Sequence, residues 1–470
     1  MANGSSLGSA SSPVRVAIVG AGPAGFFTAD ALLRSESPVF DVDVFERLPT
    51  PFGLVRAGVA PDHQKIKGVT KTFERTAKHH RFRFFGNVEV GKDLSAAELR
   101  ERYDQVVYAV GSASDRRLGI PGEELRGCHA ATAFVGWYNA HPDFRDFPFD
   151  LGTERAVVVG AGNVAMDITR VLLKSPDELA KTDIARHAVE ALRNGRVREV
   201  ALLVRRGPAQ AAFDPRELED IASLPGVRVE VNAGQLVVEP TEKLDARQER
   251  NVALLGELAA RPKVPAERSL RIEFLASPVE LTGDERGRVS RVRVERNAVS
   301  RDATGRAVAR GTGQFFDVEA GLVFRSIGYL GLPLPGVPYD PKGGVIPNQE
   351  GRVCSEPGGP VLPGVYAVGW IARGPLGVIG TNKSDAQAVA ERMVADVATL
   401  RPAGESLRGH ETVAALLTER GVSPTSYDDW SLLDRIEVDE GRSSGKIREK
   451  FASVEQMMNQ LLRARQRKDD

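Results

Sequence analysis

Two stretches of the chain share one pattern, in which a continuous apolar run meets a glycine-rich turn and then apolar residues at helical spacing. The first is VRVAIVGAGPAGFFTADALLRS, residues 14–35, and the second is RAVVVGAGNVAMDITRVLL, residues 155–173. An uninterrupted apolar run that ends at a turn is typical of a strand buried on both faces of a parallel sheet. The two stretches therefore predict two strand–turn–helix units, each at the start of an α/β domain.

The first glycine turn, residues 20–25, has the G-x-G-x-x-G spacing of a dinucleotide-binding turn. Gly20 permits the tight turn, Gly22 lets the backbone approach a pyrophosphate, and Gly25 allows close helix packing. A second predicted strand, FDVDVFERL, then delivers Glu46, whose carboxylate can accept both ribose hydroxyls. Because a carboxylate repels a 2′-phosphate, this unit favours FAD or NAD over NADP, and its place before residues 51–64 favours FAD.

The second glycine turn, residues 160–165, repeats this pattern with Gly160, Gly162 and then alanine in the third position. The strand that follows, VREVALLVRRG, ends in Arg205 and Arg206, where the first unit has its glutamate. Guanidinium groups bind phosphate oxygens through paired hydrogen bonds, each charge-assisted bond contributing about 1.5–3 kcal/mol. The second unit therefore predicts an NADP(H) site.

The next segment, AAFDPRELEDI, predicts a helix that begins at Asp214 and Pro215. Glu217 stands at the third helical position, where it can cap the helix. Its place just beyond the arginines also suits a contact with the nicotinamide, and the pattern leaves both interpretations open.

Similar strand-and-turn segments at residues 103–122 and 321–331 indicate where the chain leaves the first domain and returns to it. Alternating apolar and polar residues at 226–240 and 269–299 predict antiparallel strands beside the second parallel sheet. We expect an α/β fold of two Rossmann-like, doubly wound domains. Its predicted parts are a disordered leader at 1–12, a discontinuous FAD domain at 13–112 and 324–470, and an inserted NADP domain at 113–323.

Composition excludes several other classes of protein. Lys and Arg together number 63, as do Asp and Glu, so no net field marks the chain as a nucleic-acid or membrane-surface binder. The cysteines, Cys128 and Cys354, form no C-x-x-C pair, which argues against a dithiol redox centre, and we expect no metal site. The first residues lack the marks of a signal or transit peptide, and no apolar run is long enough to span a bilayer. A cytoplasmic protein without membrane insertion is predicted.

The segment GVYAVGWIARGPLGVIGTN, residues 364–382, predicts a strand, a Gly/Pro loop and the start of a helix. The positive end of that helix can face the pyrimidine side of a flavin and stabilise the anion formed on reduction. The backbone N–H groups of Val378 and Ile379 would be the donors.

Together these strings resemble one family, the adrenodoxin reductase-like ferredoxin–NADP⁺ reductases. The resemblance covers nearly the whole chain after residue 13, through VGAGPAGF, PFGLVRAGVAPDHQ, NVEVGKDL, VVVGAGNVAMDI, LLVRRGP, SIGY, GVIPNQEGRV and GWIARGPLGVIGTN. It implies a glutathione-reductase-type flavoprotein that moves a hydride from NADPH to N5 of FAD. Single electrons then pass, reversibly, to a ferredoxin-type iron–sulfur protein.

The resemblance also implies site residues. The implied FAD contacts are Ala24, Glu46, Leu54, Val90, Trp370, Gly377, Val378 and Ile379. The implied NADP contacts are Gly162, Asn163, Val164, Arg205, Arg206, Glu217 and the backbone at Gly377. Trp370 stands where the wider disulfide reductase group usually has Asp, which agrees with the narrower family.

The family interpretation explains residues 51–64 as a wall for the flat isoalloxazine. Glycines let the backbone approach a ring face, prolines stiffen the loop, and Leu54 and Val55 would exclude water. His63 and Glu217 are the catalytic candidates. A proton-supplying or orienting role for His63 stands beside a purely structural one.

The partner is expected to be a small acidic protein that docks transiently on a basic surface of a monomer. Arg247 and Arg250 are candidates for that surface. Three alternative functions stay open. An electron-delivery flavoprotein of glutamate-synthase type shares both nucleotide units, although this chain lacks the cysteine-rich segments typical of such proteins. A flavin monooxygenase and a non-catalytic module that senses FAD and NADP(H) are the others.

Overall fold

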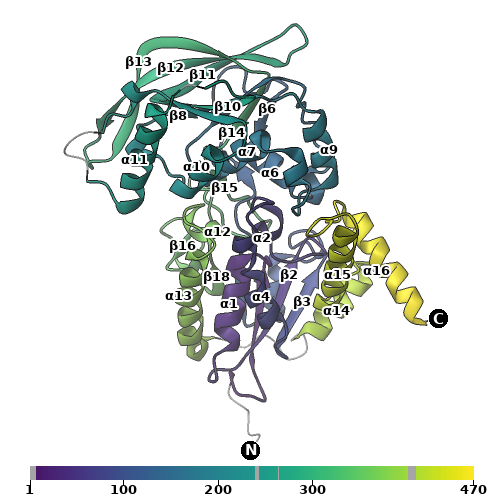
Figure 1. Cartoon of the computed structure of the whole chain (residues 1–470). Coiled ribbons are helices and arrows are strands. Elements are labelled where there is room, and N and C mark those ends of the chain that lie inside the picture. The colour runs from purple at the N-terminus through teal and green to yellow at the C-terminus, as the bar shows by residue number, and fades with distance from the viewer. Residues whose placement is uncertain (1–6, 239–242, 263, 401–408, 470) are drawn as a thin grey trace, which may run out of the picture.

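The computed structural model describes residues 7–238, 243–262, 264–400 and 409–469, which fold into two lobes stacked end to end (Figure 1). The lower lobe in that view, called the first lobe, is built on a seven-stranded sheet. Its strands lie in the order β16 (Asn348–Gln349), β17 (Arg352–Cys354), β18 (Val361–Ala367), β4 (Gln105–Tyr108), β1 (Val14–Val19), β2 (Phe40–Glu46) and β3 (Phe82–Gly86).

The upper, second lobe contains two sheets. The larger has the order β6 (Cys128–Ala130), β14 (Leu322–Arg325), β7 (Arg155–Val159), β8 (Glu199–Val204), β10 (Arg268–Phe274) and β9 (Val227–Val231). The smaller is an antiparallel sheet of β11 (Ala276–Gly283), β12 (Val289–Arg301) and β13 (Ala307–Glu319).

Helices cover both lobes. Those of the first lobe are α1 (Pro23–Leu33), α2 (Leu54–Ala57), α3 (Gln64–Lys67), α4 (Thr70–Ala77), α5 (Ala96–Arg102), α12 (Trp370–Arg373), α13 (Thr381–Asp396), η4 (Val397–Thr399), α14 (His410–Glu419), α15 (Tyr427–Ser443) and α16 (Val454–Asp469). Those of the second are α6 (Ala131–Tyr138), η1 (Pro142–Phe144), α7 (Asn163–Leu173), α8 (Pro176–Leu179), α9 (Arg186–Asn194), η2 (Pro208–Gln210), α10 (Pro215–Ala222), η3 (Ala233–Gln235) and α11 (Ala246–Ala260).

The two apolar runs become central strands, as the sequence predicts. β1 lies between β2 and β4, and β7 lies between β8 and β14, all in parallel. Five of the six residues of β1 and four of the five of β7 are buried. Helices cover both faces of the first lobe's sheet, whereas the second lobe's sheet has helices on one face and the antiparallel sheet of β11–β13 on the other. Both lobes therefore have the doubly wound α/β fold that the sequence predicts, and each glycine turn lies at the carboxyl end of a central strand.

The lobes are joined by two chain crossings that pair with each other. β5 (Ser114–Asp115) and β15 (Tyr329–Leu330) form a two-stranded antiparallel ribbon. The predicted boundary between residues 323 and 324 falls inside β14, which is the last strand of the second lobe's sheet rather than the return strand of the first. Its apolar residues pair with β6 and β7, so the crossing comes a few residues later.

Two sequence predictions are corrected. The segment at 226–240 was expected to be antiparallel, but its strand β9 pairs in parallel with β10, as β10 does with β8. Its alternating pattern has another cause: β9 is an edge strand and none of its residues is fully buried. The prediction of antiparallel strands at 269–299 is confirmed for β11 and β12 but wrong for β10, which pairs in parallel on both sides.

The predicted disordered leader is ordered in its described part. Residues 7–12 form a tight turn in which the N–H of Gly8 donates to the carbonyl of Ser12. Gly8 accepts from the N–H of Val39, and Leu7 packs against the core of the first lobe. These contacts hold the segment in place, although its serine- and glycine-rich composition alone favours disorder. The remaining leader residues, 1–6, lie outside the described residues.

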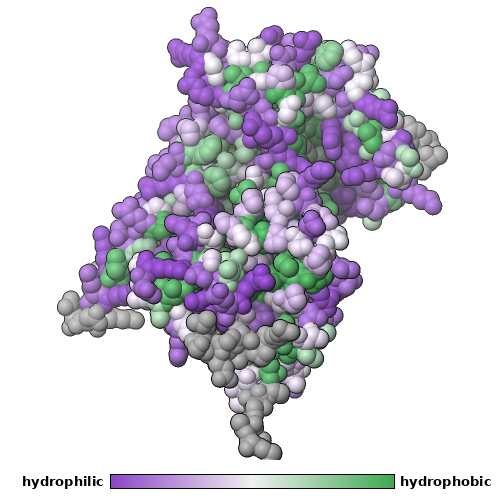
Figure 2. Space-filling model, turned by 180° about the vertical axis from the view of Figure 1, so that it is seen from behind, coloured by the Kyte–Doolittle hydropathy of each residue, from purple (hydrophilic) through white to green (hydrophobic). Residues whose placement is uncertain are grey.

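Seen from behind, the surface is mostly hydrophilic and shows a hollow where the second lobe overhangs the first (Figure 2). Among the helices of the described residues, none has the length and apolarity needed to cross a bilayer. Both cysteines are free; Cys354 is buried and Cys128 is half-buried.

The first glycine turn offers a direct test of the packing. A Cβ on Gly25 would lie 2.1 Å from the carbonyl oxygen of Gly20, so α1 would have to move away from β1. We expect Gly25→Ala to lower the free energy of unfolding by about 1–3 kcal/mol and the melting temperature of the nucleotide-free protein by several degrees.

Gly22→Ala is the matched control, because no atom lies within 4 Å of a Cβ there and the backbone φ is −82°. Its melting temperature in the nucleotide-free state should stay within about 1 °C of the wild type, since nothing has to move. Thermal unfolding followed by circular dichroism measures both variants. Equal losses in the two would contradict the packing described for Gly25.

Candidate active site

The first glycine turn is closed by the loop that follows β2. The N–H of Phe52 donates to the carbonyl of Ala21, and Gly53, at φ +47°, lies against Gly22. Space remains open beside Gly22 itself, where the backbone N–H groups of α1 begin. A phosphate group fits such an uncrowded helix N-terminus because the free N–H groups and the helix dipole favour negative charge.

Glu46 ends β2 beside this turn. Its carboxylate accepts from the N–H of Ala21 at 3.0 Å and from that of Leu48 at 3.2 Å. Burial raises the pKa of Glu46, while these two backbone donors work to lower it. The residue that the sequence assigns to a ribose is therefore fixed directly against the glycine turn.

Residues 51–58 are anchored by their apolar members. The ring of Phe52 packs against those of Phe26, Phe73 and Trp430, and Val55 is buried. Leu54 is 40% exposed. Of the two residues expected to exclude water from a flavin, Val55 faces the protein core and Leu54 faces outward.

The segment from Gly369 to α13 lies next to the same turn. A Cβ on Gly369 would be 2.7 Å from the Cβ of Ala24, so β18 ends directly against the start of α1. The ring of Trp370 stacks on Tyr329 of the crossing ribbon, and its Nε1 donates to the carbonyl of Leu376. The Trp370 side chain thus stands at the junction of the lobes.

Helix α13 begins at Thr381, within the predicted range. The N–H of Val378 donates to Oγ1 of Thr381, so one of the two expected backbone donors already has a partner. Leu376 is 71% exposed and Val378 63% exposed. Large apolar side chains that face outward beside a helix N-terminus are suited to cover by an apolar ring.

The other implied FAD contacts also lie in the first lobe. Ala24 and Val90 are buried, and Val90 bridges to Leu94 in the loop after β3. Gly377 has a φ of +78° and Ile379 is half-buried.

The second glycine turn repeats the geometry of the first. Gly160, at φ +137°, approaches the carbonyl of Ser326, and no atom lies within 4 Å of a Cβ on Gly162. Asn163 begins α7, and its Oδ1 accepts from the N–H of Asp214 at 2.8 Å. Val164 is half-buried against the core of the second lobe.

Arg205 and Arg206 follow the last residue of β8. Nδ2 of Asn297 donates to the carbonyl of Arg205, and the N–H of Leu275 donates to that of Arg206, so the backbone here is held by the neighbouring sheet. Burial, and the charges of Arg205 and Arg306, lower the pKa of Arg206. Within the described part of the chain no carboxylate pairs with Arg205 or Arg206. The positive charges of Arg205, Arg206 and Arg306 therefore form a site suited to an anion.

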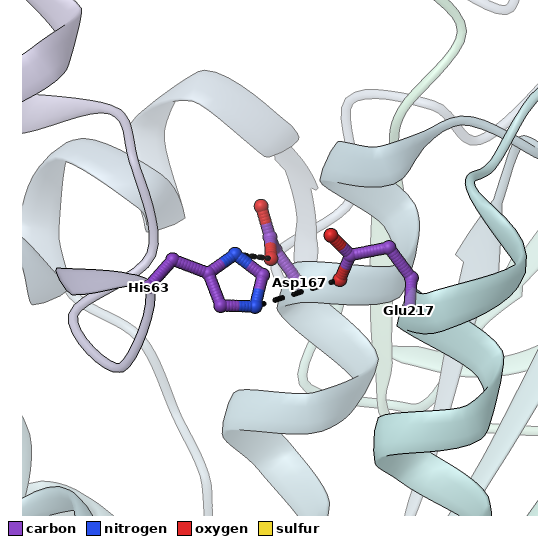
Figure 3. A group of neighbouring side chains, drawn as sticks. All are labelled: His63, Asp167 and Glu217. Carbon is purple, nitrogen blue, oxygen red and sulfur yellow. Dashed lines mark ion pairs between the residues drawn. The ribbon is translucent and has the colours of Figure 1, made fainter. Parts of the chain in front are cut away.

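His63 reaches from the first lobe into a group of carboxylates of the second (Figure 3). Its Nδ1 lies 3.7 Å from Oδ1 of Asp167, and its Nε2 lies 3.8 Å from Oε2 of Glu217. Asp220 is a third neighbour, at 3.9 Å. Asp167 comes from α7, and Glu217 comes from α10.

The carboxylates are held together by one buried cation, Arg170. Its guanidinium donates to Glu217 at 2.6 Å, to Asp167 at 2.5 Å and to Asp62 at 3.0 and 3.1 Å, and its side chain is only 2% exposed. Asp62 precedes His63 in the first lobe and also binds Lys174 at 3.0 Å. The cluster of Asp62, His63, Asp167, Arg170, Lys174 and Glu217 is called the junction charge cluster below.

Proton affinities within the junction charge cluster differ widely. Burial, together with the charge of Asp167, raises the pKa of Glu217 to about 7, against the opposing effect of Arg170. Burial and the Arg170 charge lower the pKa of His63. Burial works to raise the pKa of Asp62, but Arg170 and Lys174 outweigh it and lower that pKa. Glu217 is therefore a carboxyl poised to change its charge near neutral pH.

The spacing of His63, Asp167 and Glu217 would also suit a metal ion. However, Oδ1 of Asp167 and Oε2 of Glu217, which face the histidine, are the same atoms that accept from Arg170. The guanidinium of Arg170 thus already supplies the positive charge that a metal ion would bring to these two carboxylates.

The structure argues against the capping interpretation of Glu217, and its contact with the nicotinamide stays a prediction. The N-cap of α10 is made by Asp214, which accepts from the N–H of Arg216, and Glu217 turns away to Arg170. Sequence reasoning missed Asp62, Asp167, Arg170 and Lys174. A signal was available, because Asp167 and Arg170 are charged residues at helical spacing in a mostly apolar helix, and Lys174 follows directly after it.

The proposed docking residues have internal partners. Arg247 of α11 donates to the carbonyls of Ala211 and Phe213, and Arg250 pairs with Glu219 at 2.7 Å. The guanidinium of Arg247 therefore supports the loop before α10.

Comparison with known proteins agrees with this geometry. The profile of the family "Pyridine nucleotide-disulphide oxidoreductase" matches residues 14–243. NADPH-ferredoxin reductase FprA of Mycobacterium tuberculosis is 44% identical, with 95% of this chain and 98% of that protein covered. Human mitochondrial NADPH:adrenodoxin oxidoreductase is 42% identical over 95% of this chain and 92% of its own.

Among solved structures, M. tuberculosis FprA in complex with NADPH has a TM-score of 0.90 at 43% identity, with 96% of this chain and 100% of that chain covered. A similarity of this extent includes both lobes and the junction between them. The chain therefore belongs to the family of NADPH-ferredoxin and NADPH:adrenodoxin reductases.

Proposed function

We propose that the chain is an FAD-dependent NADPH:ferredoxin reductase. It takes a hydride from NADPH and passes single electrons, reversibly, to a ferredoxin-type iron–sulfur protein. One observation carries this proposal: the two glycine turns have neighbours of opposite charge. Glu46 lies beside the first turn, and Arg205 and Arg206 follow the strand next to the second. The lobes that contain the two turns meet at the junction charge cluster.

The first lobe fits FAD. Gly22 leaves room for the pyrophosphate, Glu46 suits the ribose hydroxyls, and the outward-facing Leu54, Leu376 and Val378 suit the isoalloxazine. When bound, FAD supplies the ability to accept a hydride and to release electrons one at a time. The N-terminus of α13 would favour the negative charge that reduction creates.

The second lobe fits NADPH. Gly162 leaves room for its pyrophosphate, and Asn163 lies at the start of α7, where the helix N-terminus favours the phosphates. Arg205 and Arg206, without carboxylate partners in the described residues, suit the 2′-phosphate that distinguishes NADPH from NADH.

Glu217 would serve the nicotinamide end of the substrate. The nicotinamide ring gains a positive charge as its hydride leaves, and an ionised carboxylate stabilises that charge. With a pKa of about 7, Glu217 is ionised in part of the molecules at neutral pH. His63 lies between Asp167 and Glu217 with its Nε2 3.8 Å from Oε2 of Glu217, so the two groups would have to move closer before they could share a proton.

The partner would be a small ferredoxin-type protein bound transiently to a monomer through charged groups. The cytoplasmic location and the monomeric state stay predictions. Arg247 is a poor position at which to test docking, because its substitution would also release the loop at Ala211 and Phe213.

The function is tested by mixing the purified, FAD-loaded protein with NADPH and an oxidised ferredoxin under anaerobic conditions. We expect ferredoxin to be reduced at about twice the rate at which NADPH is consumed, because a two-electron donor reduces two one-electron acceptors. NADPH consumption that requires oxygen and an organic substrate would indicate a monooxygenase instead. No consumption at all would favour a sensing module.

The nucleotide preference depends on Arg205 and Arg206. In the double variant Arg205→Ala/Arg206→Ala, the KM for NADPH should rise at least about tenfold, since each lost contact is worth roughly 1.5 kcal/mol or more. The KM for NADH, which has no 2′-phosphate, should change less than about twofold. Steady-state reduction of an artificial acceptor gives both values, and an unchanged ratio would remove the NADP assignment.

The affinity for NADP⁺ should depend on the ionisation of Glu217. Because the pKa of this group is raised to about 7, its carboxylate forms as the pH rises from 6 to 8 and then attracts the nicotinamide cation. We expect NADP⁺ to bind roughly tenfold more tightly at the higher pH, relative to 2′,5′-ADP. The second ligand has the same titrating 2′-phosphate but lacks the nicotinamide.

Calorimetric titration of wild type, Glu217→Gln and the control Asp220→Asn measures this ratio. The pH dependence should vanish in Glu217→Gln and persist in Asp220→Asn, whose side chain is exposed. A ratio that changes equally in all three proteins would show that another group is responsible.

A further inference from the structure

The segment between α15 and α16, residues 446–451, lies at the junction of the two lobes. In Figure 1 the loop that contains it rises from the top of α15 toward the second lobe. Its sequence is KIREKF, and four of its six side chains are charged. This segment is called the junction strap below.

Lys450 binds both lobes with one ammonium group. It donates to the carbonyl of Arg56 in the first lobe at 2.9 Å and to Oδ1 of Asn139 in the second at 3.2 Å, and it pairs with Asp183 of the second at 3.1 Å. The side chain is 1% exposed. A buried ammonium needs all its three donors satisfied, and here the partners come from two separate bodies.

Asp183 is a shared anchor. Besides Lys450, it accepts both short bonds of Lys67, at 2.7 Å to each carboxylate oxygen, and Lys67 belongs to α3 of the first lobe. Burial works to raise the pKa of Asp183, but Lys450 and Lys67 outweigh it and lower that pKa. One buried carboxylate of the second lobe is thus held by two cations of the first.

The junction strap also holds the wall beside the first glycine turn. Glu437 of α15 binds the guanidinium of Arg56 through two bonds of 2.5 and 2.8 Å and accepts from the N–H of Phe451 at 2.9 Å. Arg56 lies in α2, two residues after Leu54, and its guanidinium covers the ring of Trp430. The helix α2 is therefore held by Lys450 of the strap through the carbonyl of Arg56, and by Glu437 of α15, which the strap itself contacts, through the side chain of Arg56.

A further contact ties the strap to the second lobe. Nζ of Lys446 donates to the carbonyl of Ile184 at 2.7 Å and to Glu449 at 2.7 Å. Close packing leaves the strap little freedom, since a Cβ on Gly441 of α15 would lie 2.3 Å from the Cα of Arg448.

We propose that the junction strap sets the distance and angle between the nicotinamide and the flavin, with Lys450 and Asp183 as positioning residues that contact neither nucleotide. This inference rests on the proposed function. Within the described residues, the chain itself connects the two lobes through the short β5–β15 ribbon, about which they could pivot. The strap and the junction charge cluster give two separate fixed contacts, which together oppose such rotation.

The expected effect on the reaction is large because hydride transfer requires reacting atoms about 3–3.5 Å apart, and a misplacement of about 1 Å can cost roughly a hundredfold in rate. FAD and the 2′,5′-ADP part of NADPH would each be bound within one lobe. Loss of the strap contacts should therefore slow hydride transfer without weakening the separate sites.

The test compares Asp183→Asn and Lys450→Met with the control Arg352→Met, which breaks the pair between Arg352 and Asp396 inside the first lobe. For the two strap variants we expect the rate of anaerobic flavin reduction by saturating NADPH to fall at least about tenfold. The FAD content and the dissociation constant of 2′,5′-ADP should stay within twofold of the wild type. The control should keep the wild-type rate.

A second measurement needs no NADPH. Hydrogen–deuterium exchange in peptides that cover residues 114–116 and 328–330 should be faster in the strap variants than in the wild type or the control, because the crossing ribbon would bear the movement alone. Failure of the wild type to be reduced by NADPH would overturn the proposed function. The exchange measurement would still test whether the strap restrains the movement of the lobes, because it does not depend on that reaction.

Three results would overturn the proposal: a wild-type reduction rate in both strap variants, an equal loss in Arg352→Met, or a loss that follows the FAD content or the 2′,5′-ADP affinity. Should Lys450→Met fail to fold, Asp183→Asn retains the shape of the side chain, and Lys446→Met removes the contact to Ile184 of the second lobe together with the pair to Glu449 within the strap. Unchanged exchange of the ribbon in these variants would contradict the proposed rotation.

Discussion

The buried guanidinium of Arg170 is shared by carboxylates of both lobes, and the rest of the active site depends on this sharing. Asp62 of the first lobe and Asp167 and Glu217 of the second all bind it. A buried charge that loses a partner is left uncompensated, at a cost of roughly 3–5 kcal/mol. The lobes are therefore held at the one relative position in which His63 enters the acidic group, and the junction strap repeats this principle with Lys450 and Asp183.

The two lobes contain the same strand–turn–helix unit, and the charged residues beside each unit suit it to a different nucleotide. Each lobe has a central strand, a glycine turn and a helix N-terminus with open space beside its second glycine. Glu46 at the end of β2 suits a ribose with free hydroxyls, whereas Arg205 and Arg206 at the end of β8 suit a 2′-phosphate. One turn thereby retains a prosthetic group, and the other exchanges a soluble nucleotide.

The sequence predicts most of the fold because its signals are local. Each signal lies within a short stretch of sequence: the apolar runs at β1 and β7, the glycine spacing, and the residues at the ends of β2 and β8. The parallel pairing of β9 was not predictable, since the apolar and polar residues of an edge strand alternate whatever the direction of the strand. The place of the crossing was not predictable either, because the sequence of β14 does not show to which of the two sheets this buried strand belongs. The junction residues were missed for a similar reason: Asp62 and Arg170, or Asp183 and Lys450, are brought together only by the docking of the lobes.

The central claim is that the nucleotide of the second lobe meets the flavin of the first. Anaerobic titration of the purified protein with NADPH, followed by visible absorption, tests it most directly. The account predicts that the flavin absorption bleaches in proportion to added NADPH, with a break at one equivalent per bound FAD. A protein that binds no FAD, or whose flavin stays oxidised while NADPH is bound, would contradict it.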